Sequence, residues 1–131
     1  HLNILNKKNG VKIKYVGLLN HFQLYSLYNR SKILCLSSVF EGMPLVFPEA
    51  MYFKNAIITT DVGGATVATQ NGKSGIIVKK STVDNYTNVL QTQINNEKWL
   101  KTAGEHAHKV AVEQLDWNII VKKLYENLYP V

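Results

Sequence analysis

The chain has 131 residues, a hydrophobic fraction of 46% and a formal net charge of +6. This length suits one compact domain and is too short for two, and the hydrophobic fraction excludes a disordered segment. No apolar run approaches the roughly 20 residues that cross a bilayer. The single cysteine, Cys35, excludes an intrachain disulfide framework, so a cytoplasmic protein is the simplest interpretation.

The lysines are scattered along the chain and form no basic block interleaved with aromatic residues. This distribution argues against nucleic acid as a partner. It favours an ordinary solvated surface over the second interpretation, a peripheral contact with the inner face of a membrane. The chain starts at His1 rather than at a methionine, so we expect the numbering to begin inside a longer protein.

The first elements follow from hydrophobic periodicity and end signals. Alternating apolar and polar residues predict a strand at 11–16. Asn20 and Gln23 form the pattern of a capping box at the start of a helix. An apolar run predicts a strand at 32–38, in which we expect Cys35 to be a buried structural thiol.

The rest of the chain continues the alternation of strands and helices. Pro44 suits the first turn of a helix that runs to about residue 53. Asp116 is expected to cap a last helix that ends near residue 129. The other expected elements are strands at 56–60 and 75–78 and helices at 65–70, 83–95 and 97–114. Strands separated by helices predict parallel β-α-β units, and hence an α/β fold with a Rossmann-like sheet layered by helices.

The stretch EGMPLVFPEAM, residues 41–51, carries most of the functional information. It leaves a predicted parallel strand and opens a helix, and ligands of open α/β sheets bind at this edge. Free N–H groups at a helix start attract phosphate and sugar oxygens. Gly42 lets the backbone approach a ligand closely. Glu49 lies about one turn inside the helix and leans back toward Glu41, so both carboxylates suit a ligand with hydroxyls and phosphates, such as a nucleotide-sugar.

Two glutamates that flank seven residues, with Gly-Met-Pro after the first and Ala-Met after the second, resemble the signature of family 4 retaining glycosyltransferases. The resemblance covers nearly the whole chain in the family's order. It continues through YVG at 15–17, IITTDVGG at 57–64, NGKSGIIV at 71–78 and LDW at 115–117. The resemblance implies the C-terminal, donor-binding half of a GT-B fold and the transfer of a sugar to an acceptor hydroxyl with retained anomeric configuration.

The resemblance also implies a role for each matching residue. Glu49 would bind the ribose hydroxyls of the donor, and Glu41 would lie against the donor sugar as the catalytic candidate. The sugar hydroxyls and the diphosphate would face the backbone of Gly42, Met43, Pro44 and Leu45, and the base would lie near Gly17 and Leu18. No metal and no bound cofactor are expected, since the nucleotide-sugar is a substrate. The acceptor would be a saccharide or a lipid-linked saccharide, as in polysaccharide biosynthesis.

Compared with the family, residues 1–131 form a partial domain. The two upstream β-α units and the N-terminal acceptor domain are missing, and the final helix, about 117–129, would pack on that absent domain. Where the family usually has Gly and Pro after the motif helix, the chain has Lys54 and Ala56, so we expect Asn55 to take a left-handed turn. Two alternatives remain open: a nucleotide-sugar epimerase or phosphorylase of the same fold, and a non-catalytic remnant or interaction subunit.

Overall fold

The computed structural model describes residues 12–129. Within residues 12–129 three strands alternate with helices, and three further helices follow. In chain order the elements are α2 (His21–Arg30), β1 (Ile33–Leu36), α3 (Val46–Tyr52), β2 (Ala56–Thr60), α4 (Ala65–Thr69), the 3-10 turn η1 (Gln70–Gly72), β3 (Gly75–Val78), α5 (Val83–Gln93), α6 (Glu97–Gln114) and α7 (Trp117–Leu128).

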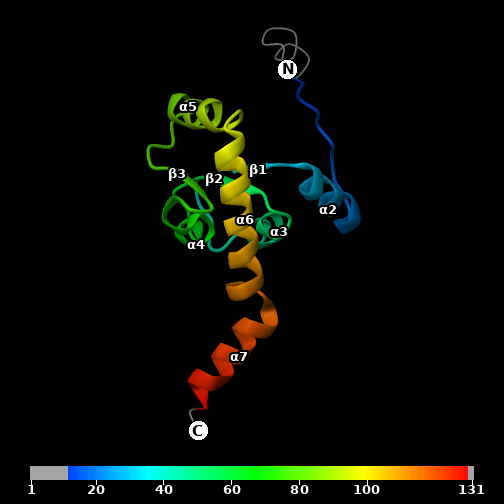
Figure 1. Cartoon of the computed structure of the whole chain (residues 1–131), viewed down its shortest axis with the longest axis vertical. Coiled ribbons are helices and arrows are strands. Elements are labelled where there is room, and N and C mark those ends of the chain that lie inside the picture. Colours follow the sequence, from blue (N-terminus) through cyan, green and yellow to red (C-terminus); the bar gives the residue numbers. More distant parts are fainter. Residues whose placement is uncertain (1–11, 130–131) are drawn as a thin grey trace.

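The strands form one parallel sheet in the order β1-β2-β3. Leu34 pairs with Ile57, which pairs in turn with Gly75. Helices connect the strands, and α3, α4 and α6 pack against β2. Figure 1 shows the long helix α6 crossing the sheet. The predicted α/β class and the predicted bounds of β2, β3 and α6 are confirmed.

The core lies between strand β2 and helices α3, α4 and α6. All five residues of β2 are buried. Because the side chains of a strand alternate between its two faces, Ile57 packs with Phe47 and Met51 of α3 while Ile58 faces the other side of the sheet. Helix α6 approaches closely at Gly104, where an added Cβ would lie 2.2 Å from the carbonyl oxygen of Lys54. A side chain at this position would therefore separate α6 from the turn between α3 and β2.

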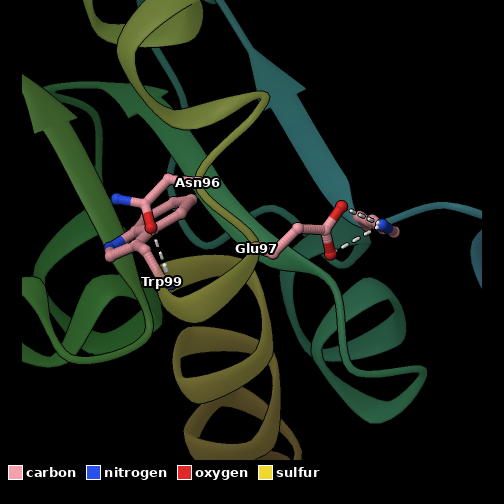
Figure 2. A network of polar contacts seen from close by, with 4 residues as sticks. Asn96, Glu97 and Trp99 are labelled. Carbon is pink, nitrogen blue, oxygen red and sulfur yellow. Dashed lines mark hydrogen bonds and ion pairs between the residues drawn. The ribbon is translucent and has the colours of Figure 1, made fainter.

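Two helix starts are capped by asparagine side chains. The side chains and backbone N–H groups of Asn20 and Gln23 bind each other reciprocally, which confirms the capping box of α2. At the start of α6 the Asn96 side chain accepts a hydrogen bond from the Trp99 backbone N–H at 3.1 Å (Figure 2). Glu97 beside it pairs with Lys32 at 2.9 Å, but both side chains are largely exposed, so the pair contributes at most about 1 kcal/mol.

Two predictions at the sheet were wrong. Residues 12–16 form no strand, and residue 11 lies outside the described residues. The only neighbour of β1 in the described sheet is β2, so residues 12–16 are not one of the paired strands of this sheet. Cys35 is exposed rather than buried, because β1 is an edge strand here. An apolar run predicts a strand, but its burial depends on what covers each face.

The turn between α3 and β2 also differs from the expectation. Lys54 takes the left-handed conformation, with φ of 62°, whereas we had expected it at Asn55. The side chain of Asn55 is completely buried, and its amide donates to the carbonyl oxygens of Tyr28, Ala50 and Phe53 at 2.9, 3.1 and 3.3 Å. The Asn55 amide makes its hydrogen bonds in the protein interior, and the exposed Lys54 takes the strained left-handed backbone conformation.

Helix α7 extends away from the rest of the molecule (Figure 1). It has no buried residue, and Trp117 is 70% exposed. The apolar residues Val121, Leu124 and Leu128 of this helix are also exposed. Among residues 12–129 no helix has both the length and the hydropathy needed to cross a membrane.

We expect the purified chain to associate through helix α7, because a large exposed apolar patch favours association. Light scattering should show a mass above that of the monomer at high concentration. Leu124→Lys should shift the chain toward the monomer, whereas Lys123→Ala on the same helix should not. A stable monomer in which Trp117 is shielded from soluble quenchers would contradict the prediction and would show that the helix packs on its own chain.

Candidate functional site

The loop that joins β1 to α3, residues 37–45, lies at the carboxyl edge of the sheet and contains Glu41. It is fixed by the neighbouring strand and loop. The hydroxyl of Thr60, the last residue of β2, donates to the carbonyl oxygen of Ser38 at 2.6 Å. The backbone N–H of Gly63 donates to the carbonyl oxygen of Glu41 at 3.1 Å. The two adjacent loops therefore hold each other in place where parallel sheets commonly bind ligands.

Gly63 and Gly64 explain why these loops can come so close together. A Cβ at Gly63 would lie 2.0 Å from the carbonyl oxygen of Gly42 and 2.5 Å from that of Glu41. Gly64 has φ of 74°, and a Cβ there would lie 2.3 Å from the sulfur of Met43. This contact could not be predicted, because a Gly-Gly pair alone does not reveal which backbone lies against it.

Gly42 is different, because nothing within the described chain requires a glycine there. It is exposed, its φ is not in the left-handed region, and a Cβ would meet no atom within 4 Å. Pro44 lies before helix α3, which starts at Val46, so Pro44 is not in the first turn as expected. Its carbonyl oxygen instead accepts a hydrogen bond from the Phe47 N–H at 3.1 Å. Met43 and Leu45 are exposed.

The two glutamates of the motif have different surroundings. Glu41 is half-buried and accepts a hydrogen bond from the Ser38 hydroxyl at 2.9 Å. Glu49 lies in the first turn of α3, also half-buried, and its Oε2 accepts a hydrogen bond from the Tyr28 hydroxyl at 3.3 Å. Within the described residues no hydrogen bond joins the two carboxylates, so each is positioned by its own partner.

Glu49 also lines a groove of about 430 Å³ between α2, α3 and the start of α7. The aromatic residues Tyr25, Tyr52 and Trp117 line the same groove. Burial, followed by the charge of Glu49, raises the pKa of Tyr28 to about 12. The Tyr28 hydroxyl therefore stays protonated at neutral pH and acts as a hydrogen-bond donor to the carboxylate.

Gly17 and Leu18 lie just before α2, at the end of a segment that is not a strand. Gly17 has φ of 67°, and the side chain of Leu18 is fully exposed. No hydrogen bond in residues 12–129 ties either residue to the loop at 37–45. The structure thus brings Gly42, Met43, Pro44, Leu45, Glu41 and Glu49 onto one continuous segment at the sheet edge, and it leaves Gly17 and Leu18 beside a different helix start.

Two histidines on α6 bind separate groups rather than each other. Nδ1 of His106 lies 2.8 Å from the hydroxyl of Ser74, and Nδ1 of His108 lies 2.5 Å from the carbonyl oxygen of Tyr52. Both contacts tie α6 to the α/β core. Each histidine is therefore explained by packing.

The fold of this chain is shared with sucrose-phosphate synthase from Thermosynechococcus elongatus. The two superimpose with a TM-score of 0.80 over 96% of this chain and 33% of the synthase, at 21% sequence identity. The model of the family Glycosyl transferases group 1 matches residues 1–110. The chain belongs to this family.

Curated relatives agree with this assignment. D-inositol 3-phosphate glycosyltransferase of Gordonia bronchialis is 30% identical over 96 residues, which are 73% of this chain and 21% of that protein. The capsular polysaccharide biosynthesis glycosyltransferase CapM of Staphylococcus aureus is 29% identical over 129 residues, which are 98% of this chain and 32% of that protein. A Campylobacter jejuni N-acetyl-D-galactosaminyltransferase, named for an undecaprenol-linked saccharide, is 28% identical over 72% of this chain and 26% of its own length. The chain thus spans between a fifth and a third of the length of these relatives.

We expect Gly63→Ala to lower stability clearly and Gly42→Ala to leave it almost unchanged. The alanine Cβ at position 63 must displace the backbone of the loop at Glu41, which should cost about 1–3 kcal/mol of unfolding free energy. The same change at Gly42 meets open space and should alter it by less than about 0.5 kcal/mol. Urea unfolding of both variants measures the difference. Equal losses would show that the two loops are not held together as described.

Proposed function

We propose that the gene product that carries this chain is a retaining glycosyltransferase of the family 4 type. It transfers a sugar from a nucleotide-sugar to the hydroxyl of a saccharide or lipid-linked acceptor. This chain supplies the donor-binding part of a GT-B enzyme, and an acceptor domain elsewhere in the gene product completes the site. Family membership over residues 1–110 supports sugar transfer, and the names of the relatives support polysaccharide or glycolipid substrates.

One observation carries the assignment of the site. The loop at 37–45 is fixed by Thr60 and Gly63, yet Gly42 within it faces open space. No contact within the described chain requires a glycine at position 42. Gly42 lies between the two motif carboxylates at the carboxyl edge of a parallel sheet, so a ligand that approaches the backbone closely explains it. The backbone N–H groups of this loop suit sugar hydroxyls and phosphate oxygens.

The two carboxylates take different parts of the donor. Glu49 accepts hydrogen bonds from the ribose hydroxyls, and Glu41 lies against the donor sugar, where charge develops during transfer. The base lies near Gly17 and Leu18. The proposed reaction uses no metal and no cofactor. The gene product acts in the cytoplasm, and for a lipid-linked acceptor it works at the inner face of the membrane, where the net charge of +6 favours anionic lipids.

A product analysis tests the activity of the intact gene product. It should release nucleoside diphosphate from a UDP-, GDP- or ADP-sugar when a saccharide or lipid-linked acceptor is added, and NMR of the product should show the anomeric configuration of the donor. Conversion into a different nucleotide-sugar would identify an epimerase, and a requirement for inorganic phosphate would identify a phosphorylase. If no nucleotide-sugar of the panel is bound, the chain is a non-catalytic subunit and the proposal fails.

Glu49→Ala in the intact gene product should weaken binding of the nucleoside diphosphate by ~1.5–3 kcal/mol, the range for a hydrogen bond to a charged group. Calorimetry with UDP, GDP or ADP measures this loss. Glu97→Ala is a suitable control, because Glu97 is an exposed carboxylate in an ion pair away from the site. An unchanged nucleotide affinity in a folded Glu49→Ala variant would contradict the ribose role.

For Glu41→Gln we expect turnover to fall far more than donor affinity, because a charge near the reacting centre acts mostly in the transition state. Steady-state rates and donor binding are measured on the same preparation of the intact gene product. The glutamine can keep the contact with Ser38 while it removes the charge. Equal losses in rate and in donor affinity would make Glu41 a ground-state contact instead.

A further inference from the structure

Tyr28, the hydrogen-bond partner of Glu49, has no part in the proposed function. The Tyr28 hydroxyl, which comes from helix α2, donates to Oε2 of Glu49 on helix α3 at 3.3 Å. Within residues 12–129 the other carboxylate oxygen, Oε1, takes no hydrogen bond. One oxygen is thus tied to the protein, and the other is available to a ligand.

Tyr28 is itself held firmly, so it can fix the direction of the Glu49 carboxylate. Only 6% of Tyr28 is exposed, and its ring packs beside that of Phe53 with centroids 6.1 Å apart. Its carbonyl oxygen accepts a hydrogen bond from the buried Asn55 amide at 2.9 Å. Because the phenol stays protonated at neutral pH, the hydrogen bond runs from Tyr28 to Glu49 and not in reverse.

We propose that Tyr28 is a positioning residue: it holds the Glu49 carboxylate so that its free oxygen meets the ribose hydroxyls of the donor. This inference rests on the proposed ribose role of Glu49. Tyr28 does not touch the ligand, yet the preference for a ribose over a sugar without these hydroxyls depends on it. Without Tyr28 the carboxylate can rotate, and part of its interaction with the diol is lost as ordering entropy.

The test compares ribonucleotides with analogues that lack the two hydroxyls. Calorimetry on the intact gene product uses UDP, GDP and ADP together with their 2′,3′-dideoxy forms. Tyr28→Phe keeps the ring and removes the donor, so it should weaken binding of the preferred ribonucleotide about five- to tenfold and leave the dideoxy form unchanged. In the Glu49→Ala background the same change should have no further effect.

Tyr86→Phe is the matched control, because the Tyr86 hydroxyl donates to the carbonyl oxygen of Ile58 at 2.8 Å inside the fold. It should lower stability and leave ribonucleotide affinity as it was. A second measurement needs no ligand: in Glu49→Gln the phenol of Tyr28 should titrate at lower pH than in the wild type, because a charge that raises its pKa is gone.

The outcomes separate the two proposals. If the wild type does not prefer ribonucleotides over their dideoxy forms, the ribose role of Glu49 fails, and the role of Tyr28 fails with it. If Glu49→Ala removes that preference and Tyr28→Phe retains it, the ribose role stands and the positioning role is overturned. An unchanged titration of Tyr28 in Glu49→Gln would also overturn the positioning role.

Discussion

The side-chain amide of Asn55 lies where helix α2, helix α3 and strand β2 meet. Its three hydrogen bonds to the carbonyl oxygens of Tyr28, Ala50 and Phe53 join the ends of both helices to the start of the central strand. The arrangement has a cost, because Oδ1 of Asn55 is buried without a partner in the described chain. Together with the packing of Tyr28 on Phe53, this side chain orients α2 and with it the tyrosine that contacts Glu49.

A second constraint acts at the other end of the strands, where their carboxyl ends lie. There the backbone of Gly63 lies directly on the backbone of the loop that carries Glu41, and a hydrogen bond from Thr60 holds the loop at Ser38. The two glutamates are thus positioned independently, one by a contact between loops and one by a contact between helices. Under the proposed function, this independence would let the sugar and the nucleotide of the donor be recognised by separate structural units.

Most of the fold could be predicted from the sequence, because caps, turns and periodicity are local signals. The capping box at Asn20 and the bounds of β2, β3 and α6 needed no tertiary information. The strand expected at 11–16 and the burial of Cys35 failed, because both depend on a neighbour across the sheet that no local pattern specifies. The motif located Glu41 and Glu49, but their partners Ser38 and Tyr28 follow only from the packing of the loop and of α2, and the ligand roles stay predictions.

The open edge at β1 gives the chain a reporter of its own. Cys35 is the only thiol in the sequence, and it is exposed on that edge strand. Partial desolvation nevertheless raises the pKa of its thiol, so less of the nucleophilic thiolate is present at neutral pH. The thiol therefore reacts slowly with alkylating reagents at neutral pH and faster in mildly alkaline buffer. Any polypeptide that adds to the sheet beside β1 would cover this sulfur. The rate of alkylation at Cys35 therefore reads out, without an engineered label, whether the sheet stands alone or has been extended.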